Sequence, residues 1–402
     1  MLDLIIKNGT CFIGGNLEKI DIGISKGKIS HIGNLKEEKS KNIIDVSDKI
    51  VLPGLMDTQV HFREPGSTDT EDLNSGSRAA IAGGITGVFE MPNTNPPTAN
   101  KEEFQKKLDL AKNRMFCNYA FYFGATPNNM KELAAVDTLK GCCGVKLFAG
   151  SSTGNLLVSQ EKDIEKVISN SSKIISVHSE DENILLSRKK YIKDGDVHSH
   201  PIWRNEECAL ESTKRVVRIA QKYKKKIHIL HVTTKQEIDF FSEKRDNVTF
   251  EITPQHLTIY APDCYDSLKT FSQMNPPLRS KDHYDRLWNA VDESLVSTIG
   301  SDHAPHTKEE KNRKYPLSPS GMPGVQTLLP VMLDHVNKGK LKIEKLIKLV
   351  CENPCDLFGI KNKGYIKENF DADLTVIDMN KEVIIKDDWI ESKCGWTPFN
   401  NY

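Results

Sequence analysis

The chain has 402 residues, of which 38% are hydrophobic and 27% charged, as expected for a soluble globular protein with a substantial core. This length exceeds that of one small domain and suits one large barrel with an appended domain. Lysine and arginine together number 55, as do aspartate and glutamate, so the formal net charge is +0 and no overall basic field exists to bind nucleic acid or an anionic membrane.

Three further features indicate a cytoplasmic protein. No apolar run reaches the roughly 18 to 20 residues that a membrane-spanning helix needs. The first residues, Met1–Lys7, lack a basic stretch followed by a long apolar one, so we expect no signal peptide. The cysteines number 9 and are scattered, which argues against a disulfide framework or a zinc ribbon and favours reduced thiols.

The N-terminal part of the chain consists of short strands separated by glycine turns. Residues 4–15 and 20–33 alternate apolar and polar side chains in a pattern typical of antiparallel sheet. A similar pattern returns at residues 364–377. We therefore predict that residues 1–50 and 360–402 form one small β domain, with residues 51–359 inserted between them.

The inserted part contains short, mostly apolar runs that nearly all end in or just before a polar residue. They are 51–61, 87–93, 118–124, 144–148, 174–178, 227–231, 248–253 and 296–302. Helical stretches lie between most of these runs. Eight such alternations over about 250 residues predict an α/β fold, a (β/α)8 TIM barrel. In such a barrel the C-terminal ends of the strands converge on one face, where active sites are built.

Side chains able to bind a metal ion or transfer a proton fall at these strand ends. His61 ends the first run, and Gln59 faces the same way because it lies two residues earlier in a strand. Lys146 lies inside an apolar strand, where a charged amine is costly, so it must be paired, neutral or modified. Three other runs end in His178, His231 and Asp302. A lone histidine at a strand end is more often a hydrogen-bonded core residue, but five candidates on five strands favour a metal site for an ion such as Zn²⁺.

Four motifs, in the same order along the chain, resemble the dihydroorotases of the amidohydrolase superfamily. They are Asp57–Gly66, Met91–Pro97, Gly144–Phe148 and Ser301–His306. The similarity extends from about residue 4 to residue 380. It implies a TIM-barrel hydrolase with a small β-sandwich built from both termini. The implied reaction is the metal-dependent, reversible hydrolysis of the cyclic amide of dihydroorotate, a small molecule, to N-carbamoyl-L-aspartate in pyrimidine biosynthesis.

The resemblance also implies a role for each matching residue. The implied zinc ligands are His61, Lys146 as a carboxylated bridge, His178, His231 and Asp302. The implied substrate contacts are Arg63 and Asn93, which would bind the substrate carboxylate, together with Asn275 and His306. Asp302 would also transfer protons, since with an ordinary pKa near 3.9 it is ionised and able to accept one from water. We expect a homo-oligomer, with aspartate transcarbamoylase as a candidate partner.

Gln59 departs from the family pattern, which has the first histidine of a His-x-His pair at this position. The amide oxygen of glutamine is neutral and a weaker zinc donor than imidazole. We therefore expect one zinc ion held tightly by Lys146, His178 and His231, and a second that is weakly bound or absent. The sequence also stops at Tyr402, earlier than relatives whose C-terminal strands continue, which predicts an incomplete β domain.

Several alternatives stay open at this stage. Another cyclic amidohydrolase, such as a hydantoinase or allantoinase, is disfavoured by Arg63, Asn93 and Asn275, because a neutral ring has no carboxylate for them to bind. The alternative for Arg63 is a salt bridge at the surface or between loops. A catalytically inactive partner of aspartate transcarbamoylase would explain Gln59 but would need no other metal ligands. The segment 304–324 is either a lid over the site or a solvated loop. His200 lies in a polar loop and is expected in solvent, whereas His256 either faces the site or stays in the core.

Overall fold

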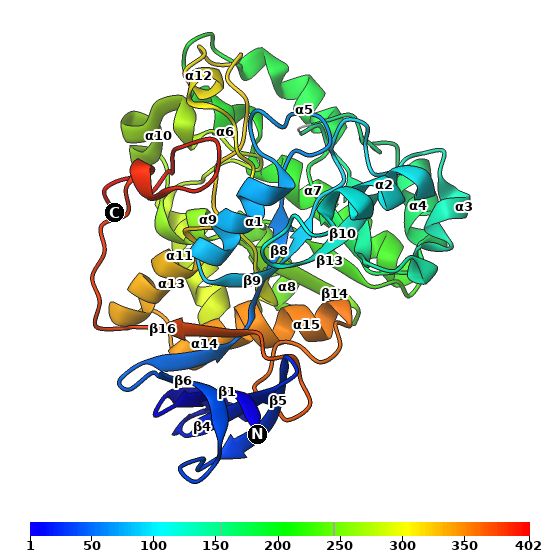
Figure 1. Cartoon of the computed structure of the whole chain (residues 1–402). Helices are drawn as coiled ribbons and strands as arrows, with labels where there is room; N and C mark the ends of the chain where they lie inside the picture. The colour runs from blue at the N-terminus through cyan, green and yellow to red at the C-terminus, as the bar shows by residue number, and fades with distance from the viewer. Residues whose placement is uncertain (153, 244–245) are drawn as a thin grey trace.

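The centre of the molecule is a parallel eight-stranded sheet that closes into a barrel. The computed structural model describes residues 1–152, 154–243 and 246–402. The strands follow each other around the sheet in chain order (Figure 1). They are β8 (Leu55–Val60), β9 (Ile85–Glu90), β10 (Asn118–Gly124), β11 (Cys142–Phe148), β12 (Ile175–His178), β13 (Ile227–Ile229), β14 (Val248–Ile252) and β15 (Thr298–Ile299). A parallel bridge between Val60 and His303 joins the two outer strands. The predicted (β/α)8 barrel is confirmed.

The first apolar run of the sequence contains two strands rather than one. Residues Ile50–Pro53 form β7, which belongs to a small sheet, and the barrel strand β8 starts only at Leu55. Gly54 separates them. A Cβ atom there would lie 2.4 Å from Oγ1 of Thr86 and 2.7 Å from Cβ of Asp373, so only glycine fits where the chain passes between the two sheets.

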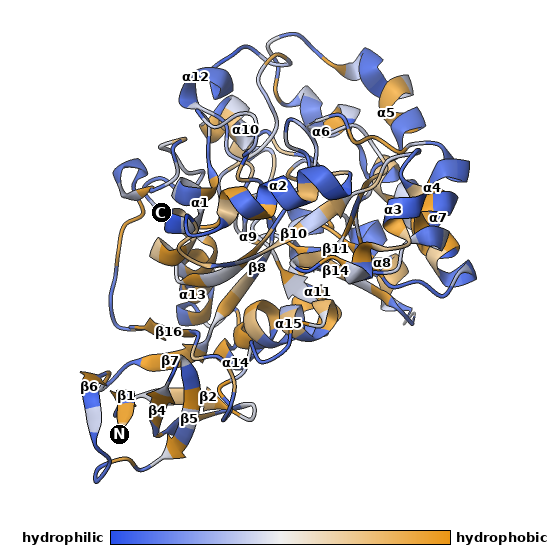
Figure 2. Ribbon diagram, turned by 45° about the vertical axis from the view of Figure 1, so that its right-hand side comes forward, coloured by the Kyte–Doolittle hydropathy of each residue, from blue (hydrophilic) through white to orange (hydrophobic). Residues whose placement is uncertain are grey.

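Helices surround the barrel and connect successive strands. The longer ones are α1 (Leu73–Ala82), α2 (Lys101–Ala111), α4 (Glu161–Asn170), α7 (Glu206–Lys222), α8 (Lys235–Ser242), α11 (Lys281–Asp292) and α13 (Leu328–Asn337). Shorter ones are α3 (Met130–Leu133), α5 (Glu182–Arg188), α6 (Ser199–Trp203), α9 (Pro254–Thr258), α10 (Asp263–Leu268), α12 (Lys308–Lys311), α14 (Ile343–Ile347) and α15 (Asn353–Phe358). Hydrophilic residues colour much of α2 and α4 on the outside of the molecule, as expected for helices with one buried face (Figure 2). Within the described residues, no helix has the length and apolar character needed to cross a membrane.

Two small four-stranded sheets lie at the end of the barrel opposite the carboxyl ends of its strands (Figure 1). One has the order β5-β4-β1-β6 and the other β16-β7-β2-β3. Their strands are β1 (Leu2–Lys7), β2 (Thr10–Ile13), β3 (Asn16–Lys19), β4 (Asp21–Ser25), β5 (Lys28–Gly33), β6 (Ser40–Asp45), β7 and β16 (Leu374–Ile377). Because β16 pairs with β7, both ends of the chain contribute to this region. The domain boundaries at residues 50 and 360 stay a prediction.

The last residues of the chain leave the small sheets and run along the side of the barrel (Figure 1). Ile385 and Phe399 pack on Val331 of α13. The indole nitrogen of Trp396 donates a hydrogen bond to the backbone oxygen of His306 over 2.7 Å. Residues 385–402, which the predicted boundary assigns to the small β domain, therefore pack against the barrel and support a loop of its upper face.

Candidate active site

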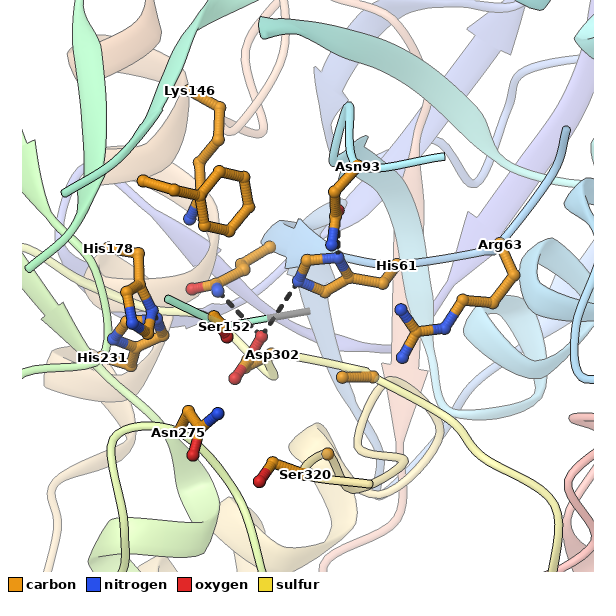
Figure 3. A pocket seen from close by; sticks show the side chains of 14 residues that line it. His61, Arg63, Asn93, Lys146, Ser152, His178, His231, Asn275, Asp302 and Ser320 are labelled. Atoms are coloured by element: carbon orange, nitrogen blue, oxygen red, sulfur yellow. Dashed lines mark hydrogen bonds and ion pairs between the residues drawn. The ribbon is translucent and has the colours of Figure 1, made fainter. Parts of the chain in front are cut away.

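A narrow pocket lies at the carboxyl ends of the barrel strands (Figure 3). The structure brings together nearly all the residues singled out from the sequence. Its lining includes Gln59, His61, Arg63, Asn93, Lys146, His178, His231, Asn275 and Asp302. His306 is the exception, because it lines a neighbouring cavity that shares Arg63 and Asn93 with this pocket. The convergence follows from the parallel barrel, in which each strand delivers its last residues to the same face.

Two of the histidines meet nitrogen to nitrogen. Nδ1 of His178 lies 3.1 Å from Nε2 of His231, and the two rings stand nearly perpendicular, at 78°. Nε2 of His178 contacts the carboxylate of Glu180 at 2.8 Å. Burial is the main reason why the pKa values of both imidazoles fall below the ordinary value. Both rings are therefore neutral near pH 7, the form in which imidazole binds metal ions.

Lys146 points into the same part of the pocket from the middle of the barrel wall (Figure 3). Its side chain is fully buried, and among the described residues Nζ has no hydrogen-bond partner. The nitrogen lies 4.5 Å from the centre of the Phe148 ring. Burial lowers the pKa of this amine, because the charged form has lost its water and gained no ion pair. Of the three states that the sequence allowed, the described residues offer Lys146 no ion-pair partner, and a pKa of about 7 makes the neutral amine accessible near neutrality.

Gln59, His61 and Asp302 form a second group across the pocket. Nε2 of Gln59 donates a hydrogen bond to Oδ1 of Asp302 over 2.8 Å, and Nε2 of His61 lies 3.3 Å from the same oxygen. Nδ1 of His61 contacts Oδ1 of Asn93 at 2.7 Å. Burial raises the pKa of Asp302 above that of an exposed aspartate, so the ordinary value used for the sequence does not apply.

Arg63 is buried beside the pocket without an acidic partner. Its Nε donates to the backbone oxygen of Pro305 over 3.1 Å, and one terminal nitrogen lies 3.4 Å from Nε2 of His306. No ion pair of Arg63 occurs within residues 1–152, 154–243 and 246–402, so the loop salt bridge considered above is not seen. Burial lowers the pKa of Arg63 to about 10, which still leaves it charged near neutrality. A buried guanidinium of this kind suits an anionic ligand.

Asn275 is oriented by a histidine that the sequence placed in solvent. Nε2 of His200 contacts both Oδ1 of Asn275 and the backbone oxygen of Met274 at 3.0 Å. Since both partners are acceptors, Nε2 carries the hydrogen and holds the Asn275 carbonyl, which turns the amide nitrogen toward the pocket (Figure 3). His200 is fully buried, so the expectation of a solvated residue was wrong. His256 is also buried, but it contacts Thr253 and Pro276 rather than lining the pocket.

The segment 304–324 forms one wall of the pocket. Ala304, Ser320 and Gly321 line it. Nζ of Lys311 is fully buried and donates to the backbone oxygens of Gln273, Pro319 and Gly321 over 2.8 to 3.0 Å. Two of these bonds close the segment on itself and the third ties it to Gln273, so the part of it that lines the pocket is packed.

Backbone conformation marks the same strand ends. Arg63, His231 and Asp302 have φ values of 62°, 36° and 45°, in the left-handed region that non-glycine residues seldom adopt. Strain of this kind clusters at functional sites, where the surrounding structure holds side chains in set directions. This strained backbone conformation depends on the folded structure, and the residue types at these positions do not predict it.

Sequence reasoning missed the buried groups that support the pocket residues. These supporting groups are Glu180, Arg204 and His200. Sequence reasoning also assigned no role to Phe148 and Ser320, which line the pocket. Glu180 follows His178 by two residues, and this spacing was a signal that could have found it. Arg204 and His200 come from the long connection after β12, and nothing in the sequence predicts how that connection packs.

The donor atoms of the pocket lie in two pairs. His178 adjoins His231, and His61 adjoins Asp302. Across the described part of the chain, no three or more His, Cys, Asp or Glu side chains form a ready cluster for a metal ion. The remaining group that faces the histidine pair is the amine of Lys146, which is no ordinary metal ligand (Figure 3).

Comparison with known proteins agrees with the barrel and the pocket. A parallel barrel with reactive side chains at its strand ends is the architecture of a TIM-barrel enzyme. The model of the amidohydrolase family matches residues 50–398, so the chain belongs to this family. A dihydroorotase of Methanosarcina acetivorans is 34% identical over 99% of this chain and 88% of its own length. One of Pyrococcus furiosus is 35% identical over 95% of this chain and 84% of its own length.

The solved structures give the same architecture. An L-hydantoinase (dihydropyrimidinase) of Arthrobacter aurescens superposes with a TM-score of 0.94 at 27% identity. The match covers 100% of this chain and 92% of the hydantoinase. The resemblance to the dihydroorotases drawn from four short motifs thus extends over nearly the whole chain.

Proposed function

We propose that this protein is a dihydroorotase, which interconverts dihydroorotate and N-carbamoyl-L-aspartate with the aid of bound zinc. The observation that carries the proposal is Arg63, a buried guanidinium without an acidic partner in the described part of the chain. It lies at the edge of a pocket that also holds three histidines, Asp302 and Lys146. Both reactants carry a carboxylate, and a planar guanidinium can bind one with two parallel hydrogen bonds. The dihydroorotase relatives, similar over nearly the full chain, support the same substrate.

The donor set fits a zinc centre once Lys146 is modified. A neutral amine adds CO₂ at Nζ and releases one proton, and the resulting carbamate offers two oxygens. We propose that this carbamate, His178 and His231 hold one ion, while His61 and Asp302 contribute to a second, weaker site. The Nζ of Lys146, which has no hydrogen-bond partner among the described residues, supports this assignment, as do Nδ1 of His178 and Nε2 of His231, which face each other. When bound, zinc polarises the amide carbonyl of the substrate and lowers the pKa of water.

The side chains of the pocket would bind the substrate and move the proton. Arg63 and Asn93 lie on one side, where they would hold the substrate carboxylate, and Asn275 offers its amide nitrogen from the other (Figure 3). Asp302 accepts a proton from the attacking water and passes it to the ring nitrogen as the amide C–N bond breaks. A raised pKa makes Asp302 a better proton acceptor than an exposed aspartate. His306 contacts Arg63 and would act through it.

A hydantoinase activity is the second candidate, because the Arthrobacter L-hydantoinase has so similar a fold. Its ring substrates lack a carboxylate and would leave Arg63 unpaired. The test is an assay of zinc-loaded protein with dihydroorotate, hydantoin and allantoin at equal concentration. We expect turnover of dihydroorotate far above that of the two neutral rings. A preference for hydantoin would overturn the proposal. Folded, zinc-loaded protein without any activity would instead favour an inactive partner of aspartate transcarbamoylase.

A further inference from the structure

We propose that Glu180 and Arg204 form a positioning pair that fixes the tautomer of His178, so that this imidazole presents Nδ1 to a metal ion. The inference deepens the proposed function and shares with it one premise, that His178 is a ligand. It adds which nitrogen binds, which side chain sets that choice, and which second side chain holds the first in place. Neither Glu180 nor Arg204 reaches the pocket itself.

The contact between His178 and Glu180 determines where the imidazole hydrogen lies. Nε2 of His178 is 2.8 Å from Oε2 of Glu180. An ionised carboxylate only accepts hydrogen bonds, so Nε2 must carry the hydrogen. A neutral imidazole has one N–H group, and Nδ1 is therefore left with its lone pair. That nitrogen faces His231 at the pocket wall, 3.1 Å from Nε2 of the second ring.

Arg204 holds the Glu180 carboxylate in this orientation. Its Nε lies 3.1 and 3.2 Å from the two carboxylate oxygens, and Nη2 lies 2.5 Å from Oε2. Glu180 is fully buried and Arg204 is 2% exposed, so water does not compete for these bonds. Arg204 also donates to the backbone oxygen of Ser151 over 2.5 Å, next to Ser152 in the pocket lining. Arg204 thus connects Glu180, which contacts His178, to the loop that contains Ser152 of the pocket lining.

Among the described residues, neither of the other two histidines has an arginine-held carboxylate behind its ring. Nδ1 of His61 contacts the amide oxygen of Asn93, and its Nε2 lies 3.3 Å from Asp302, which itself lines the pocket. Nδ1 of His231 has no hydrogen-bond partner within the described residues, so no carboxylate selects its tautomer. A carboxylate behind a metal-binding histidine orients the ring and increases its basicity. Of the three rings, His178 is accordingly the one whose tautomer is set by a carboxylate that lies outside the pocket lining.

The first test measures the tautomer directly, in metal-free protein and without substrate. Protein labelled with ¹⁵N-histidine is recorded in long-range ¹H–¹⁵N correlation spectra, and the His178 signals are identified by their loss in His178→Asn. We expect the neutral form with hydrogen on Nε2. In Glu180→Gln the result should invert. Arg204 can only donate, so it takes the glutamine carbonyl, and the amide N–H group is then left to face His178. Hydrogen on Nδ1 in the wild type would refute the proposal.

The second test measures zinc affinity by competition with a chromophoric chelator. Glu180→Gln should bind zinc 10- to 100-fold more weakly, by roughly the loss seen for such supporting carboxylates, and Glu180→Asp should recover part of it. The matched control is Glu237→Gln, since Glu237 is equally buried but bonds only to Thr234 and Thr213, away from the pocket. Unchanged affinity in folded Glu180→Gln would overturn the inference. If this variant does not fold, the wild-type spectrum still decides.

These tests separate the inference from the proposed function. Zinc binding with the expected tautomer, but without turnover of dihydroorotate, would remove the proposed function and leave the positioning pair standing. Turnover of dihydroorotate with hydrogen on Nδ1 of His178 would support the proposed function and refute the positioning pair.

Discussion

Gln59 and Asp302 are joined by a 2.8 Å hydrogen bond in which the glutamine amide nitrogen donates to Oδ1. Nε2 of His61 lies 3.3 Å from the same oxygen. The only atom of Gln59 with a lone pair for a metal ion, Oε1, is buried without a hydrogen-bond partner among the described residues. The amide therefore directs a hydrogen-bond donor, and not a metal ligand, at Asp302. This arrangement supports the expectation of one weak zinc site.

Replacing Gln59 with histidine should restore that site. We expect Gln59→His to bind about two zinc ions per chain where the wild type retains about one, because imidazole is the better zinc donor. Elemental analysis after exhaustive dialysis measures the ratio. Gln59→Asn, which keeps an amide, is the control and should not gain metal. An unchanged ratio in folded Gln59→His would mean that residue 59 does not face the ion.

Removing the guanidinium of Arg63 should weaken substrate binding with little effect on zinc content. Hydrogen bonds to a charged group contribute about 1.5–3 kcal/mol, so Arg63→Met should raise KM for N-carbamoyl-L-aspartate about 10- to 100-fold. Arg63→Lys should recover little of this, since an ammonium group cannot make two parallel bonds. Steady-state kinetics and zinc analysis of the same preparations provide the test. Loss of zinc in Arg63→Met would instead indicate a structural role.

Most residues that line the pocket could be predicted from the sequence, because in a parallel barrel the position of a residue at a strand end fixes the face on which it lies. His61, His178 and Asp302 each follow a buried apolar run, and a parallel barrel carries every such position to one face. No knowledge of side-chain packing is needed for that step. The approximate positions of all eight barrel strands were likewise visible, and the main error was to fuse β7 with β8 across Gly54.

The buried side chains that orient the pocket residues could not be predicted from the sequence, and the reason is physical. His200 acts on Asn275, which is 75 residues away, and the polar composition around His200 suggested a solvated loop. The ring is buried because it packs edge-on against Trp203 and Tyr315. Such burial depends on how a long connection folds back over the barrel, and residue types alone do not encode it locally.

His200 gives a prediction with a close control. His200→Gln should loosen Asn275 and raise KM more than it lowers kcat, because the change affects binding of the substrate and not proton transfer. His198→Gln removes a half-exposed histidine two residues away that contacts Asp266 and the ring of Tyr265 and does not line the pocket, and it should leave both constants unchanged. The test is to measure KM and kcat of the two variants and of the wild type under the same conditions. Equal effects in both would assign them to the loop as a whole and not to Asn275.

The contact between Glu206 and His283 predicts a stability that depends on pH. Nε2 of His283 lies 3.5 Å from Oε1 of Glu206, and mainly through this contact, with Arg279 nearby, the pKa of Glu206 falls to about 2 in the folded chain. The unfolded chain has the ordinary value, so the stabilisation is complete above about pH 4.5 and is lost as the pH falls toward 2.

Glu206→Gln should therefore lower the free energy of unfolding near neutral pH, and the difference from the wild type should shrink on acidification. Urea denaturation near pH 6, 4 and 3 measures it. Glu206 is partly exposed, so solvent screening keeps the effect small. Glu207→Gln is the matched control, because Glu207 shares the first turn of α7 but is exposed, and both carboxylates interact alike with the helix dipole. The contact with His283 is the cause only if the loss of stability in Glu206→Gln exceeds that in this control near pH 6 and the gap narrows steadily from pH 4 to pH 3. A constant gap across that range would assign the effect to packing.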